Sequence, residues 1–451
     1  MGAILNIFLH GLKTTLLVPV GLAICSCSGT QDSDRLDLNE EVQVALNETE
    51  ALNKTTGSEI IEVDDFNLAL KVAVDAAPTV QSLKQAERAL SSQLLALESQ
   101  KKPQITSNAR AGVIRYDNTQ AESVSGVALN VLLSQLIYDG GYVSSSIGSA
   151  EAQLRLAQAR TLKEKNRVAR DAAAAWFTLW EAQQSFLLLS DLQSEIITFQ
   201  DQAERMSDVG LVDRSVLDSV ERKLLTFEGK RSDAESALRS AQMEYVRYFK
   251  MLPEEMRYPK LPDSYRKIGL DVTAKFVNPA MRIAALELII EKQFVKVKKS
   301  EFSPQVFFEF GVTSPVNKSD EANLRGGLNV RYTITDGGKR AAELSAAKEN
   351  VISKQHALNA TRQEVGLLKK LLLERFDNAQ NAEAMMRKSV LGAKERFMVA
   401  ESQIQTGKSN IVELVEARYQ YVISEIDLLA KTAEKERLQL ELVELLGLYD
   451  S

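Results

Sequence analysis

The sequence contains little of the chemistry on which most active sites and metal sites depend. Its 451 residues include two histidines, His10 and His356, and two cysteines, Cys25 and Cys27, both near the N-terminus. The body of the chain therefore has no thiol and one imidazole, which argues against metal sites built on these residues and against nucleophilic triads. We expect no metal, no other cofactor and no enzymatic activity.

Other residue types and patterns that are scarce or absent limit the possible fold classes and functions. The chain has 9 prolines and 22 glycines and is rich in alanine, leucine, glutamate, lysine, arginine and glutamine, a composition typical of long helices. Beyond the N-terminal segment no run approaches the ~20 apolar residues of a membrane-spanning helix, so a membrane passage would have to be built from strands. A net charge of −6 argues against nucleic acid as a partner. The phosphate-binding pattern GxxxxGK[ST] is also absent.

The N-terminus has the features of an export signal. Lys13 is the only charged residue before position 27, and it precedes an apolar run too short to span a bilayer. The next segment, Ile24-Cys25-Ser26-Cys27, resembles the cleavage site of bacterial lipoproteins. We therefore predict a lipoprotein signal peptide over 1–26 and a lipid on Cys27, with an unlipidated secretory peptide as the alternative.

The rest of the chain is one pattern repeated. Pro78 and Pro103 are 25 residues apart, and so are Pro279 and Pro304. Self-similarity on this scale indicates a duplicated structural unit. We predict an acidic tether over 27–64, a first repeat over 65–250, a proline-rich linker over 251–266 and a second repeat over 267–451.

A second pair of landmarks marks the long helices. Asp139-Gly140-Gly141 precedes Gly210 by 71 residues, and Asp336-Gly337-Gly338 precedes Gly407 by the same interval. Between these landmarks the chain is almost free of proline and glycine and repeats apolar residues at helical spacing, as in coiled coils. The pattern predicts a helical hairpin in each repeat, with strand-exit turns at the DGG sequences and tip turns at Gly210 and Gly407.

Before each DGG the apolar period changes from that of a helix to that of a strand. We predict β-hairpins over 104–137 and 305–335, with strands of about ten residues. Phe307 and Leu132 are the exceptions to the alternation.

Charged residues share these strands with continuous apolar stripes. Glu309, Arg325 and Arg331 alternate with residues such as Phe308 and Val330. A soluble sandwich can also have one polar and one apolar face, but four strands are too few for a sandwich with its own core. Transmembrane barrels require strands that are apolar outward and polar inward. Since four strands cannot close a useful barrel, the pattern favours a homotrimer.

The sequence resembles the TolC-like outer membrane factor family. The resemblance spans most of the mature chain and rests on the paired spacing of short motifs. These motifs are Ser134-Gln135-Leu136-Ile137-Tyr138-Asp139-Gly140-Gly141, its counterpart Thr333-Ile334-Thr335-Asp336-Gly337-Gly338, and the tips Val209-Gly210-Leu211-Val212 and Thr406-Gly407-Lys408-Ser409.

The resemblance implies a mainly helical fold with a small β part. Each chain would add four strands to a trimeric twelve-stranded barrel and a helical hairpin pair to a tube across the periplasm. It implies outer membrane lipid around the barrel, and a periplasmic adaptor with an inner-membrane pump or ABC exporter at the helical tips. The location would be the outer membrane of a Gram-negative bacterium, with a lipid anchor at Cys27.

The same resemblance implies a periplasmic gate. The acidic positions that close these channels correspond to Glu413 and Glu416, six and nine residues after Gly407. Residues three apart lie on one helix face, so a trimer would hold two rings of carboxylates. The alternative is that both are ordinary solvated charges. Glu309, Arg325 and Arg331 would line the barrel lumen.

We therefore predict a passive outer membrane exit duct of a tripartite efflux system. A type I protein secretion channel is the alternative within the family. A periplasmic scaffold lipoprotein without a pore is a more distant alternative, which the alternating strands disfavour.

Overall fold

The computed structural model describes residues 66–115, 123–210, 213–253, 256–261, 265, 278–313, 323–405 and 410–449. The predicted signal peptide, the tether, Cys27 and Gly407 lie outside the described residues. The elements of the first part of the chain, in order, are α3 (Phe66–Ala76), α4 (Pro78–Ser99), β1 (Gln104–Arg115), β2 (Ser123–Tyr138), α5 (Tyr142–Asp208) and α6 (Arg214–Phe249).

The second part repeats this order. Its elements are α8 (Pro279–Ser300), β3 (Gln305–Thr313), β4 (Asn323–Arg331), α9 (Lys339–Gln405) and α10 (Ile411–Leu446). The predicted fold class, mainly helical with four antiparallel strands, is confirmed at the level of the single chain.

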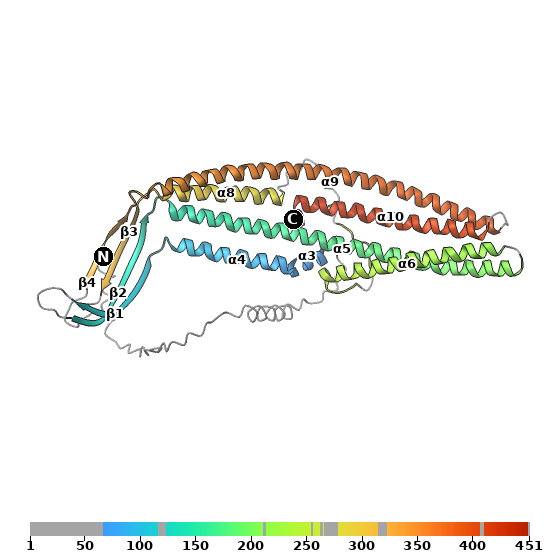
Figure 1. The fold of residues 1–451 in the computed structure, drawn as a ribbon, viewed down its shortest axis with the longest axis horizontal. Coiled ribbons are helices and arrows are strands. Elements are labelled where there is room, and N and C mark those ends of the chain that lie inside the picture. The colour runs from blue at the N-terminus through green and yellow to red at the C-terminus, as the bar shows by residue number, and fades with distance from the viewer. Residues whose placement is uncertain are drawn as a thin grey trace. The chain divides into compact units, whose positions relative to one another are not determined.

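The two long hairpins lie side by side within residues 61–451. Helix α5 contacts α6, α9 contacts α10, and α10 also packs on α5. The shorter helices α4 and α8 run beside the parts of α5 and α9 that lie nearer the sheet (Figure 1). The two 67-residue helices would each be about 100 Å long at 1.5 Å per residue.

Proline marks the start of the helix before each β-hairpin. Ala77 has extended backbone and separates α3 from α4, which begins at Pro78 because proline favours the first turn of a helix. In the second repeat Asn278 caps α8, its Oδ1 accepting hydrogen bonds from the amides of Ala280 (2.8 Å) and Met281 (3.2 Å). Its Nδ2 donates to the carbonyl of Leu445, so this cap also joins α8 to the end of α10.

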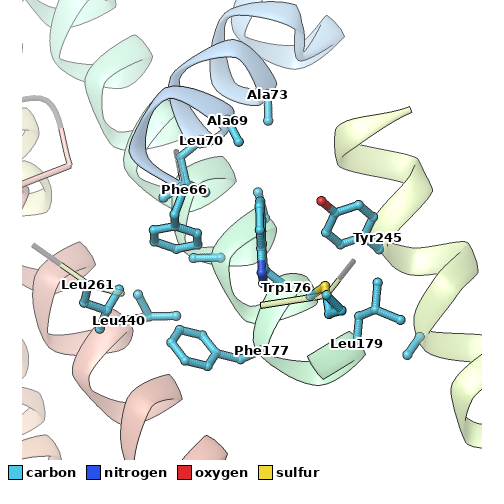
Figure 2. Packing of buried hydrophobic residues seen from close by; sticks show 14 residues of the cluster. Phe66, Ala69, Leu70, Ala73, Trp176, Phe177, Leu179, Tyr245, Leu261 and Leu440 are labelled. Atoms are coloured by element: carbon cyan, nitrogen blue, oxygen red, sulfur yellow. The ribbon is translucent and has the colours of Figure 1, made fainter. Parts of the chain in front are cut away.

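The largest apolar cluster lies where α3, α5, α6, α10 and the inter-repeat linker meet. Trp176 stands between Phe66 and Tyr245, with ring centroids 5.3 Å and 5.4 Å away in edge-to-face geometry (Figure 2). Met256 and Leu261 from the linker and Leu440 from α10 complete it. Such aromatic pairs contribute about 0.5–1.5 kcal/mol each beyond the area they bury. The linker is therefore part of the core.

The four strands form one antiparallel sheet in the order β1-β2-β3-β4. β4 ends at Arg331, four residues before the predicted end of the second hairpin, because Arg331 pairs with Gln305, the first residue after Pro304. Beyond that pair β3 offers no partner, and the carbonyl of Thr333 instead accepts a hydrogen bond from Arg340 (2.9 Å). The sheet therefore ends level with the prolines that close the preceding helices.

Candidate functional site

The two faces of the sheet differ in polarity. Side chains alternate along a strand, and residues paired across antiparallel strands share a face. The register thus assigns the exposed apolar side chains to one face: Ile105, Leu129, Val131, Phe308, Phe310, Leu324, Leu328 and Val330. Monomeric soluble proteins rarely expose an apolar patch of this extent. The described part of the chain leaves this patch uncovered.

The opposite face carries the charged residues singled out from the sequence. Glu309, Arg325 and Arg331 all lie on it. Glu309 Oε2 accepts a hydrogen bond from Asn329 Nδ2 (3.2 Å), and Thr313 Oγ1 donates to Asn130 Oδ1 (3.1 Å). The structure therefore combines a polar, charged surface and an apolar surface in one layer.

Both edges of the sheet are open as far as the described residues show. Among the described strands, β1 pairs only with β2, and β4 pairs only with β3. Each edge strand therefore offers a row of backbone donors and acceptors that another strand can pair with.

The DGG sequences connect the sheet to the long helices. Asp139 accepts hydrogen bonds from the amides of Gly141 (2.8 Å) and Val143 (2.7 Å) and so caps α5. Asp336 accepts from the amides of Gly338 (3.1 Å) and Arg340 (3.1 Å). The carboxylate satisfies amides that the first turn of a helix leaves unpaired.

The glycines of these turns have left-handed backbone, with φ between 67° and 91° for Gly140, Gly141, Gly337 and Gly338. Their surroundings differ. A Cβ added at Gly140 would overlap the side chain of Ser303, whereas one added at Gly337 or Gly338 would meet nothing within 4 Å. Of these four glycines, only Gly140 lies too close to the segment after α8 to accommodate a Cβ.

The structure places Glu413 and Glu416 in the first turns of α10, at the end of the hairpins opposite the sheet (Figure 1). Glu413 is exposed, and its amide donates to Asn410 Oδ1 (2.9 Å) in a helix cap. The carboxylate of Glu416 forms an ion pair with Lys223 of α6 and accepts a hydrogen bond from Gln420 (2.9 Å). The hydrogen bond from Lys223 lowers the pKa of Glu416 more than partial burial raises it.

A second ion pair ties the same part of α10 to α5. The guanidinium of Arg418 donates to both carboxylate oxygens of Glu195, at 2.5 Å and 2.8 Å. It also lies over the rings of Phe397 and Tyr421, 5.2 Å and 5.3 Å from their centroids. A bidentate pair of this kind fixes geometry as well as charge. Arg418 therefore links α5, α9 and α10 near the tip.

Spacing within one repeat could not identify Lys223 or Glu195 as partners of α10. They lie 193 and 223 residues from their partners in sequence and belong to the other repeat. The spacing from Gly407 identifies the two carboxylates but carries no information about their counter-charges.

Among the described residues, no group of three or more histidine, cysteine, aspartate or glutamate residues is arranged to hold a metal ion. None of the described helices has the length and apolar character needed to cross a membrane.

Residues 273–448 match the family model described as outer membrane efflux protein. The chain is similar to the CmeC outer membrane channel of Campylobacter jejuni, with 12% identity over 87% of this chain and 89% of that chain and a TM-score of 0.72. The chain is also similar to the outer membrane protein VceC of Vibrio cholerae, with 13% identity over 84% of this chain and 95% of that chain and a TM-score of 0.72. For the open state of the MtrE outer membrane channel of Neisseria gonorrhoeae, the identity is 16% over 87% of this chain and 93% of that chain, and the TM-score is 0.71. No curated protein sequence matches the chain.

Proposed function

We propose that the chain is a passive exit duct of the outer membrane, because residues 273–448 match the family model described as outer membrane efflux protein and the chain has the fold of outer membrane channels. The matched family model and the similar structures are those of channel proteins and not of enzymes. The observation that carries the proposal is the sheet with one apolar face, one charged face and two open edges.

In this proposal three copies close the sheet. Lipid offers no partner for backbone donors and acceptors, so a membrane sheet must have no edge. If β4 of one copy pairs with β1 of the next, three chains form a barrel of twelve strands with Glu309, Arg325 and Arg331 toward the lumen. The hairpins α5–α6 and α9–α10 then extend into the periplasm, with Gly210 and Gly407 at their tips.

The duct proposal predicts a trimeric pore. Purified protein should have the mass of three chains in detergent by light scattering, and it should conduct ions in planar bilayers. Fewer than three chains would supply too few strands to close a barrel around a pore of useful width. A helical monomer, or a trimer that never conducts, would contradict the proposal.

At the tip we propose that Glu413 and Glu416 form rings of carboxylates in the trimer. Negative rings in a constriction favour cations. The pairs Glu416–Lys223 and Arg418–Glu195 hold α10 against α6 and α5, so widening the tip by moving α10 must break them. These two pairs would stabilise the closed form.

Breaking the deeper pair should open the tip. The Arg418 side chain is 16% exposed, and its hydrogen bonds to Glu195 are worth about 1–2 kcal/mol after solvent screening, near a tenfold change in the opening equilibrium. Arg418→Gln and Glu195→Gln should each raise the open probability of single channels by about that factor. The matched control is Arg437→Gln, which removes another α10–α5 pair, Arg437–Glu181 (2.9 Å), farther from the tip. Equal effects at Arg418 and Arg437 would mean that the Arg418–Glu195 pair has no specific role in gating.

The tip should also respond to acid. Because the pKa of Glu416 is lowered in the folded chain, its ion pair stabilises the closed form above the ordinary glutamate pKa and is lost as pH falls through the lowered pKa. Open probability should therefore rise at acidic pH in the wild type and rise less in Glu416→Gln.

We further propose that the tips receive cargo from a periplasmic adaptor and an inner-membrane pump. A type I secretion exporter is the alternative, and a poreless scaffold is the distant one. The two-faced sheet favours a pore over a scaffold, because a scaffold has no need for an exposed apolar face beside arginines.

Lipidation of Cys27 is a separate proposal. Radiolabelled palmitate should enter the wild type and be absent from Cys27→Ser. The acylated glyceryl group that carries the label is joined to the cysteine sulfur by a thioether, so serine at this position cannot hold it. Loss of label in Cys25→Ser alone would show that the cleavage site is misassigned.

A further inference from the structure

Two glutamates are nearly fully buried where α9 and α10 pack together, and one of them is well supplied with hydrogen bonds. Glu383 of α9 and Glu436 of α10 are each 5% exposed. The carboxylate of Glu383 accepts hydrogen bonds from Lys435 (2.8 Å) and Arg387 (2.5 Å). The hydroxyl of Thr432 donates a third (3.3 Å). Three donors therefore compensate for the burial of this carboxylate.

Glu436 has no such compensation among the described residues. Its Oε1 lies 3.3 Å from the ammonium of Lys435, which already donates to Glu383. Its Oε2 is buried and has no hydrogen-bond partner in the described part of the chain. Native structures rarely leave a buried polar atom unpaired, and an ionised group costs more to bury than a neutral one. Glu436 therefore needs a donor that the described residues do not supply.

The charges around Glu436 favour a positive group at this oxygen. The two buried carboxylates share one ammonium, that of Lys435, whose side chain is 19% exposed. The guanidinium of Arg387 belongs to a side chain that is 62% exposed, so water screens its charge. Other charged side chains on this part of α10 form ion pairs and add no net charge: Lys431–Glu434 and Arg437–Glu181.

A groove of about 310 Å³ borders this carboxylate. At about 30 Å³ for each water, its volume equals that of roughly ten water molecules, which suits a small organic molecule. The Tyr258 ring in its wall is fixed by the core, since it packs edge to face on Trp180 with centroids 4.9 Å apart. The groove is lined by two aromatic residues and four polar or charged ones: Tyr258, Phe376, Gln380, Lys435, Glu436 and Gln439.

These walls complement a primary ammonium ion with a small apolar body. An ammonium group has three donors and no acceptor, and so supplies what Oε2 of Glu436 lacks. The rings of Phe376 and Tyr258 can pack on the apolar body and attract its charge. An alcohol could donate one hydrogen bond but would leave the charge of the carboxylate uncompensated. A divalent metal ion would find too few ligands, because the described residues contain no group of three or more suitable side chains.

We infer that Glu436, Phe376 and Tyr258 form a binding site for small organic primary ammonium ions between α9, α10 and the inter-repeat linker. The site lies in the helical part of the chain, and the inference does not depend on the proposed duct. A bound amine would contact the linker and both helices at once. It should therefore stabilise the folded chain in proportion to its occupancy.

The test is isothermal titration calorimetry with the full-length protein in detergent. The probe is 2-phenylethylammonium chloride, and 2-phenylethanol is the matched neutral compound. The ammonium compound should bind as one molecule per chain and at least tenfold more tightly than the alcohol. Only the ammonium compound carries a charge that can pair with Glu436.

Two substitutions separate the contributions of charge and ring. Glu436→Gln should weaken binding of the ammonium compound at least tenfold, while the unfolding midpoint stays close to that of the wild type, because Oε2 has no hydrogen bond to lose among the described residues. Phe376→Leu keeps an apolar side chain without the ring and should weaken binding about fivefold. The control is Asp427→Asn, which removes an exposed carboxylate nine residues earlier in α10 and should leave binding unchanged.

Equal affinity for the two compounds, or binding that survives Glu436→Gln, would overturn the site. Failure of the wild type to bind the ammonium compound at millimolar concentration would also overturn it, and would mean that water satisfies Oε2. If Glu436→Gln does not fold, Phe376→Leu decides the question. None of these outcomes bears on conductance, so the site and the duct stand or fall separately.

Discussion

Alanine in place of Gly140 should destabilise the folded chain by about 2–5 kcal/mol, whereas alanine in place of Gly337 should cost about 1–2 kcal/mol. The two positions have nearly the same backbone, with φ of 67° and 68°, so both substitutions carry the cost of a left-handed alanine. Only at Gly140 would the added Cβ overlap Ser303. Overpacking of this kind adds about 1–3 kcal/mol.

The comparison is made by urea unfolding in detergent, with the midpoint as the measured quantity. Ser303→Gly in the Gly140→Ala background removes the overlapping atoms. It should restore the midpoint to the level of Gly337→Ala, apart from the separate cost of the new glycine. If the two single variants lose the same stability, the contact between the first DGG turn and the end of α8 has no energetic importance.

Arginine in place of Leu328 should prevent assembly in the membrane, whereas arginine at the next residue, Asn329, should be tolerated. Leu328 lies on the apolar face of β4 and is 68% exposed in the single chain. An arginine facing lipid near the middle of a barrel strand costs about 2–4 kcal/mol per chain. A trimer carries this cost three times. Asn329 faces the charged side, where the lumen would solvate the guanidinium.

The measurement is the amount of trimer in the outer membrane fraction and the number of conducting channels per unit of protein. Leu328→Arg should reduce both to near background, and Asn329→Arg should keep trimer yield while changing ion preference. Equal tolerance of the two substitutions would mean that the apolar face does not meet lipid. Reversed tolerance would mean that the faces are assigned the wrong way round.

Much of the fold could be predicted from the sequence because local rules and packing agree. Pro78 and Pro279 mark the starts of α4 and α8, and the DGG turns mark the starts of α5 and α9. Period-two alternation marks the strands because one face must be apolar over its whole length. The end of β4 was harder to predict from the sequence, because it depends on where its partner β3 begins and not on the residues of β4.

The site was predictable only in part, for a related reason. The shared face of Glu309, Arg325 and Arg331 follows from alternation within each strand together with the pairing of the strands. The counter-charges at the tip, Lys223 and Glu195, come from the other repeat and leave no local signal. The difference between the two DGG turns also leaves no local signal, because the turns have the same sequence and only Gly140 contacts Ser303.

The aromatic cluster around Trp176 draws its members from both ends of the described chain. Phe66 opens the first described helix, and Leu440 lies near the end of the last one. Contacts so distant in sequence are slow to form, because closing such a loop loses much chain entropy before any contact forms. If the chain is exported as the proposed duct requires, its N-terminal half would therefore emerge with this cluster unfinished. Its aromatic rings would stay exposed until the last helix arrived, and a chain cut short before Leu440 would be a natural target for periplasmic chaperones and proteases.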